Sequence, residues 1–179
     1  PYMPRIGGQL NGDFHVMIDD GERLSVVSDL NVKGLSYENY AMGNLGTEMV
    51  YLQGEGASHI VEARLMKDND EVGLLKGTYY NDDEPAIDAV FEMNRTPLDL
   101  VNGFIPDQLF GFEGYAEGKL AIKGKTDSPV VDGEVYLDSS RLGSVPYGMK
   151  LRFDDDPVRI VGSQLLLENF TAYAHNDNP

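Results

Sequence analysis

Cysteine and tryptophan are both absent from this chain of 179 residues. The lack of cysteine excludes disulfide bonds, thiol nucleophiles and thiolate metal ligands. Long apolar runs are missing as well: no segment approaches the roughly 18 consecutive apolar residues of a membrane-spanning helix, and no basic stretch followed by an apolar one resembles a signal peptide. Because the chain starts at Pro1 instead of methionine, we expect it to be one fragment of a longer protein, with any targeting segment outside it.

Basic residues are scarce. The chain has 14 Lys and Arg against 30 Asp and Glu, which gives a formal net charge of −16. This balance argues against a nucleic-acid partner, because neutralising phosphates requires clustered cations. The same charge repels anionic membrane surfaces, so we expect any lipid contact to involve acyl tails inside a protected groove.

The sequence also lacks a recognisable catalytic or metal-binding motif. The histidines, His15, His59 and His175, are expected at outward strand positions or near a terminus, away from any serine in a nucleophile context. Acidic clusters at 68–71, 81–84 and 154–156 contain the oxygen ligands that calcium prefers, but polar hairpin tips have the same composition and none fits the twelve-residue calcium loop. We therefore predict no catalytic residue, no metal and no cofactor, and expect a protein that is not an enzyme.

What the sequence does contain is strand alternation, most clearly from Gly111 to Leu137. Alternate residues from Ala116 to Ile122 are small or apolar, the residues between them are largely charged, and the returning segment from Val131 to Leu137 repeats this pattern. A period of two places all side chains of one kind on one face of a strand. Residues 124–129 supply turn chemistry between the two strands.

Similar alternation in the first half predicts strands around Phe14 to Ile18, Leu24 to Val32, Val61 to Leu65 and Ile87 to Met93, with a hairpin at Asp20-Gly21. Segments 45–52 and 72–80 have apolar residues in both phases, so their faces cannot be assigned. The strand spacing predicts an all-β fold, a curved antiparallel meander. We divide it into a first strand set at 1–95 and a helix with a second strand set at 96–179.

One short amphipathic helix is predicted near residues 97–105. Thr96 is expected to cap it and Pro97 to occupy its first position, with Asp99 opposing the positive end of the dipole. Its apolar residues are expected to share one face and to form a lid. These lid residues are Leu98, Val101, Phe104 and Ile105.

The stretch from Gly111 to Leu137 resembles the repeat unit of the TamB family, the AsmA-like translocation and assembly module proteins of double-membraned bacteria. The resemblance rests on the glycine-spaced strand, on the Gly-x-x-x-x-Pro turn from Gly124 to Pro129, and on Asp132-Gly133 in the returning strand. The preceding helix is similar to the one that such chains lay over one end of their curved sheet.

The resemblance implies a β-taco, a sheet folded lengthwise over its own apolar face. It also implies a periplasmic location in the cell envelope, a full-length protein anchored in the inner membrane, and a groove that shelters phospholipid acyl chains in transit between the membranes, without reaction or cofactor. The groove residues expected on this basis are Phe14, Val16, Ile18, Leu24, Val26, Ile87, Phe91, Met93, Leu120, Ile122, Val131, Val135, Leu137, Met149, Leu151 and Phe153.

Three other interpretations remain open. Alternating apolar residues also line closed sandwiches and barrels, which leave no room for a ligand. A TamB-like protein could instead assemble outer-membrane β-barrels beside a barrel partner of the TamA type, by pairing an incoming strand with an open sheet edge. The third is a carbohydrate-binding or adhesion β-sandwich, for which the candidate residues are Tyr37, Tyr40, Tyr79, Tyr80 and Tyr147.

Overall fold

Long antiparallel strands make up almost the whole molecule, which confirms the all-β prediction. The computed structural model describes residues 4–38, 40–105, 109–144, 146–154, 157–166 and 171–174. The strands are β1 (Ile6–Ile18), β2 (Leu24–Tyr37), β3 (Tyr40–Gln53), β4 (Ser58–Lys67), β5 (Asp70–Tyr80), β6 (Ala86–Pro97), β7 (Gly111–Lys125), β8 (Val130–Ser144), β9 (Met149–Phe153), β10 (Pro157–Val161), β11 (Gln164–Leu166) and β12 (Ala172–Ala174).

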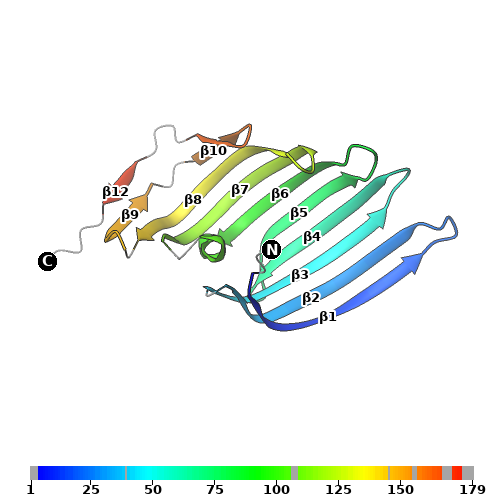
Figure 1. Cartoon of the computed structure of the whole chain (residues 1–179), viewed down its shortest axis with the longest axis horizontal. Coiled ribbons are helices and arrows are strands. Elements are labelled where there is room, and N and C mark those ends of the chain that lie inside the picture. Colours follow the sequence, from blue (N-terminus) through cyan, green and yellow to red (C-terminus); the bar gives the residue numbers. More distant parts are fainter. Residues whose placement is uncertain are drawn as a thin grey trace.

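All twelve strands belong to a single curved sheet (Figure 1). From β1 to β8, each strand pairs with the next one in the chain. The connections are short hairpins, including the expected one between Ile18 and Leu24, except that the longer segment 98–110 joins β6 to β7. The sheet then branches, because β10 pairs with the first half of β8 and β9 with its second half. β11 and β12 extend these two branches. Within the described residues β1 pairs with β2 alone, so the sheet stays open.

The strand register assigns the two faces of the sheet. Residues directly opposite each other on neighbouring strands point to the same side, and one unbroken row runs Val16, Val26, Tyr51, Val61, Gly77, Ala89, Ile122 and Val131 across β1 to β8. This row and those in phase with it define the apolar face. The alternate residues define the polar face.

The register also resolves the two ambiguous segments. In β5, Leu75 lies opposite Ala63 and Phe91 on the apolar face, whereas Leu74 lies opposite Arg64 and Glu92 on the polar face. In β3, the residues in phase with Tyr51 belong to the apolar face, and Glu48, Val50 and Leu52 belong to the polar face. The polar face is thus not uniformly charged.

The predicted helix is present, but as a 3-10 helix, η1 (Leu98–Phe104). Its N-cap residue is Pro97, and no side chain caps it, so the prediction of a Thr96 cap is wrong. The Thr96 hydroxyl instead donates a hydrogen bond to the Val72 carbonyl, because Thr96 still belongs to β6 and lies beside the start of β5. No helix in the described part of the chain has the length and apolarity needed to cross a membrane.

The sheet covers itself very little. The chain exposes 11906 Å², whereas a compact monomer of this mass exposes roughly 8,600 Å². The buried hydrophobic residues among those described are few and mostly small: Met42, Val72, Ala89, Ala116, Val135 and Val158. The alternative interpretation, in which a sandwich or barrel closes over the apolar positions, is therefore wrong for the described residues.

Candidate functional site

The apolar face brings together every predicted groove residue from Phe14 to Leu137. It also includes residues from the strands that the sequence left unassigned, among them Met49, Leu65 and Leu75. Met149, Leu151 and Phe153 share one face of β9, which pairs with β8 beyond the irregularity in the β7–β8 register between Glu113 and Tyr115. The sequence pattern therefore predicts correctly which of these residues share a face of the sheet.

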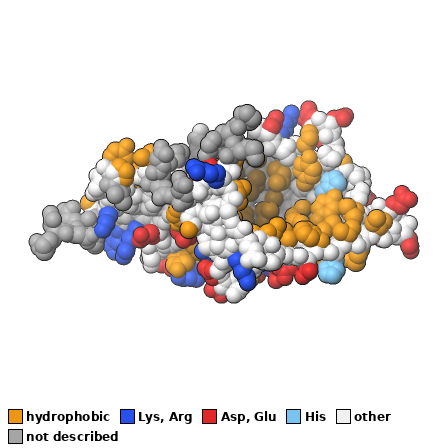
Figure 2. Space-filling view, turned by 60° about the horizontal axis from the view of Figure 1, so that its bottom comes forward, with side chains coloured by type: hydrophobic (Ala, Val, Ile, Leu, Met, Phe, Trp, Pro, Cys, Tyr) orange, Lys and Arg blue, Asp and Glu red, His pale blue; other side chains and the backbone are white. Residues whose placement is uncertain are grey.

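Side chains on the apolar face form a continuous lining with little over it. The Phe91 ring leans over Gly73 of β5, where a methyl group in place of the glycine hydrogen would lie 2.7 Å from the ring. Phe91 also lies opposite Leu75 and Leu120. Figure 2 shows a hollow whose floor and rim carry hydrophobic side chains. Because the sheet is curved, its apolar side chains would contact a hydrocarbon ligand from below and from both sides.

Exposure is greatest at β1, the edge of this face. Phe14, Val16 and Ile18 are 61%, 62% and 69% exposed. Single exposed apolar residues are ordinary on a protein surface, but three on one face of one strand form a contiguous exposed patch. They alternate with His15 and other residues on the polar face. The apolar lining thus continues to the open edge of the sheet.

A small polar group interrupts the apolar face where β3 ends and β4 begins. The hydroxyl of Tyr51 and Nδ1 of His59 are 2.6 Å apart, and the His59 ring lies between those of Tyr51 and Tyr79, with centroids 5.7 and 5.9 Å away. The prediction that His59 points outward is wrong, because its register opposite Gln53 and Tyr79 places it on the apolar face. No group of three or more potential metal ligands occurs among the described residues.

At the other end of these strands, η1 contacts β2, β3 and β7 and closes the apolar face. The side chain of Asn102 makes the hydrogen bonds that hold η1 there. Its Nδ2 donates to the Phe112 carbonyl at 2.9 Å and to the Tyr40 hydroxyl at 3.3 Å, and its Oδ1 accepts from the Phe112 amide at 2.7 Å. β6 ends at Pro97, opposite Tyr115, so the Asn102 amide takes the place of a strand partner for Phe112.

The lid prediction needs correction in its details. Val101 is 45% exposed, so it does not face inward. The buried residues of η1 are instead Asn102 and Gly103, and Gly103 lies against Tyr40 and Met42. Leu98 and Ile105 are half-buried, and the Phe104 side chain lies outside the described residues. The sequence predicted a lid of apolar residues, whereas in the structure the polar side chain of Asn102 connects η1 to β3 and β7.

We expect Asn102→Ala to lower the free energy of unfolding by about 2 kcal/mol, because it leaves the Phe112 amide and carbonyl without these partners in a partly buried position. Urea unfolding followed by circular dichroism measures this change. Asn11→Ala in exposed β1 is the matched control and should change stability by less than about 0.5 kcal/mol. Equal losses in the two variants would contradict the bridging role of Asn102.

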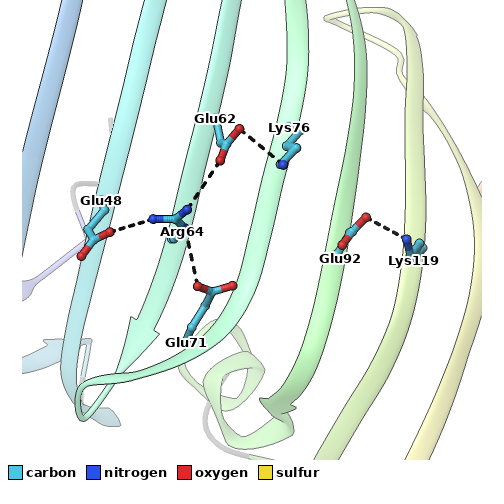
Figure 3. A network of polar contacts seen from close by, with 7 residues as sticks. All are labelled: Glu48, Glu62, Arg64, Glu71, Lys76, Glu92 and Lys119. Carbon is cyan, nitrogen blue, oxygen red and sulfur yellow. Dashed lines mark hydrogen bonds and ion pairs between the residues drawn. The ribbon is translucent and has the colours of Figure 1, made fainter.

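The polar face carries a network of charges across several strands (Figure 3). Arg64 of β4 lies 3.2 Å from Glu48 of β3 and 3.5 Å from Glu71 of β5, and Glu62 connects Arg64 at 3.9 Å with Lys76 at 3.4 Å. These side chains are roughly half exposed, so each pair adds little stability. Their effect is to make one face much more costly to dehydrate than the other.

One pair of this face makes stability depend on pH. Lys119 donates a hydrogen bond of 2.8 Å to Glu92 and holds the pKa of that carboxyl below its ordinary value of 4.5. A lowered folded-state pKa stabilises the fold above the ordinary pKa, and this contribution is lost as the pH falls through the folded-state value.

We therefore expect Glu92→Gln to be slightly less stable than the unaltered chain at neutral pH and equally stable at a pH below the folded-state pKa. Urea unfolding at a series of pH values measures the difference. Glu117→Gln is the control, since Glu117 forms no ion pair among the described residues. A difference between Glu92→Gln and the unaltered chain that does not change with pH would contradict the assignment.

The tyrosines proposed for carbohydrate binding do not form one platform. Tyr37 and Tyr40 lie opposite each other near η1, Tyr79 and Tyr80 end β5 at the far side of the sheet, and Tyr147 stacks on Phe110. Comparison of the chain with protein-family models, curated proteins and solved structures finds no match. The geometry of the open apolar face is therefore the evidence for function.

Proposed function

We propose that this chain is a segment of a non-enzymatic conduit that shelters phospholipid acyl chains on its apolar face, as expected for a TamB-like protein of the cell envelope. The supporting observation is the continuous apolar lining of a single-layer sheet, open along β1 and closed by η1 at one end. Its predicted partners are phospholipids that pass between the inner and outer membranes.

The energetics of transfer support this proposal. Each methylene group kept from water is worth about 0.8 kcal/mol, so a tail of about fifteen carbons saves roughly 12 kcal/mol. The protein gains as well, because side chains such as Phe14 and Val16 are more than half exposed without a ligand. No bond is made or broken, and no cofactor is needed.

A pair of adjacent leucines allows a strict test. The photoreactive residue p-benzoylphenylalanine is introduced in place of Leu75, on the apolar face, or of Leu74, on the polar face of the same strand. After irradiation in the presence of phospholipid, mass spectrometry should find lipid adducts at position 75 and few or none at position 74. Equal labelling at both positions, or none at position 75 in a folded protein, would refute the conduit.

The long free edge of β1 favours a second candidate function, β-strand addition by an unfolded outer-membrane barrel protein. All 13 residues of β1 are exposed, and its register with β2 has a single shift, between Gly7 and Gln9. Such an edge offers a regular row of backbone donors and acceptors. Hydrogen exchange with a barrel-strand peptide should protect β1 amides, and detergent should not compete; exchange that is unchanged by the peptide would argue against this function.

A further inference from the structure

A pocket that combines basic and apolar side chains lies where the ends of β7 and β8 meet β9 and β12, and Leu151 of the predicted groove is among its lining residues. Its volume is about 660 Å³. Arg141 of β8 lines it together with Lys150 and Arg152 of β9, and Glu113 is the single carboxylate among the described lining residues. Figure 2 shows Lys and Arg side chains gathered at the end of the molecule where Figure 1 places β9 and β12. The chain has a net charge of −16, whereas the charged residues that line this pocket are mostly positive.

The two arginines are placed in a way that is unfavourable without a ligand. Arg141 and Arg152 lie directly opposite each other on β8 and β9. Like charges at directly opposed positions destabilise an antiparallel pair. Among the described residues, neither forms an ion pair with a carboxylate, although Glu113 lies opposite Arg141 on the other side. An anion between the guanidinium groups would convert this repulsion into attraction.

A tyrosine side chain forms one wall of the pocket. The Arg152 guanidinium lies 5.2 Å from the centroid of the Tyr173 ring, and the Tyr173 hydroxyl donates to Asp154 at 3.2 Å. The cation–π contact restrains the guanidinium plane while leaving its N–H groups available along the edge. Two opposed guanidinium groups, of which that of Arg152 is restrained, suit the several acceptor oxygens of a phosphate, which arginine binds in bidentate fashion.

We propose that this pocket binds a phosphate group, either as free phosphate or as the headgroup of an anionic phospholipid. The proposal does not rest on the hydrocarbon conduit, which requires no charge, although Leu151 of the predicted groove also lines the pocket. It also changes the expectation drawn from net charge, because the repulsion of anions by the whole chain is screened beyond about 10 Å at ordinary salt, whereas the arginines act at contact distance.

The test uses two probes and three variants. Inorganic phosphate is titrated into the protein by calorimetry, and flotation measures binding to phosphatidylcholine vesicles with and without phosphatidic acid. Arg141→Gln and Arg152→Gln should each weaken binding by about tenfold or more. Lys33→Gln removes one positive charge from exposed β2, far from the pocket, and should leave binding nearly unchanged.

A stability measurement separates loss of the site from loss of the fold. Without phosphate, each arginine variant should unfold at the same temperature as the unaltered chain or higher, because one of two opposed like charges is gone. With phosphate, the unaltered chain and Lys33→Gln should gain stability, and the arginine variants should not.

The two probes distinguish the sources of the phosphate. Binding of inorganic phosphate that both arginine variants lose supports a site for the free ion. Binding that is confined to vesicles with phosphatidic acid and is lost in the same variants supports a headgroup site. Binding to neither probe, or binding that Lys33→Gln weakens as much as Arg141→Gln does, would overturn the proposal, whatever the outcome for the apolar face.

Discussion

Phe91→Asp is expected to reduce bound phospholipid by more than tenfold. Phe91 lies in the middle of the apolar face, opposite Leu75 and Leu120, with its ring over Gly73. A carboxylate there would have to give up its water to an acyl chain without a compensating partner, and this cost exceeds the gain from several buried methylenes. Native mass spectrometry of the purified protein measures the lipid that remains bound.

The neighbouring residue provides the matched control. Val90 belongs to the same strand but to the polar face, where it lies opposite Lys76. Val90→Asp introduces the same charge into the same strand beside a cation, so it should keep its lipid. Phe91→Ala separates the loss of the ring from the addition of charge and should retain more lipid than Phe91→Asp. Lipid loss of the same size in Phe91→Asp and Val90→Asp would show that lipid does not contact the apolar face.

Much of this face could be predicted from the sequence because strand alternation is a local property. In β7, Leu120 and Ile122 alternate with Lys119 and Lys123, and pairing with β8 keeps the two sets on opposite faces. The segment around Leu74 and Leu75 could not be assigned, since adjacent leucines satisfy both phases equally. Only the register with the neighbouring strands β4 and β6 decides which leucine lies on the apolar face.

The end of the groove was harder to predict, for a related reason. Apolar spacing pointed to Val101 as part of the lid, whereas the structure uses Asn102. The need for an amide at this position arises from the early end of β6 beside β7, which leaves the Phe112 backbone without a partner on the β6 side, while β8 pairs with it on the other. No pattern within η1 indicates that these backbone groups need a partner, because the need arises only once the sheet has formed.

The same limit applies to the basic pocket. Arg141 and Arg152 are separated by a turn and by two half-strands, so nothing in their spacing marks them as a pair. Net charge pointed away from any anion site, because an average over the whole chain hides a local group of cations. Register brings the two arginines opposite each other. The faces of the strands were accessible to sequence reasoning, and particular cross-strand partners were not.

The largest effect on stability is expected at Gly118, where the backbone of β8 leaves no room for a side chain on β7. Gly118 has φ +148°, and a methyl group there would lie 2.2 Å from the Glu134 carbonyl oxygen. Across the pair, a methyl group at Gly133 would lie 2.1 Å from the Lys119 carbonyl oxygen. Glycine inside a strand marks such close backbone approach and permits sharp bending. These two residues therefore allow the long strands β7 and β8 to curve around the apolar face.

Gly118→Ala should lower the free energy of unfolding by about 3 kcal/mol or more, because neither the backbone conformation nor the neighbouring carbonyl accommodates a side chain. Gly111→Ala, in the same strand, is the control: nothing lies within 4 Å of the added methyl group, so stability should change by less than about 1 kcal/mol. Urea unfolding of both variants measures the difference. If Gly118→Ala were as stable as Gly111→Ala, β7 and β8 would not need this close approach, and the curvature that forms the groove would have to arise from other strands.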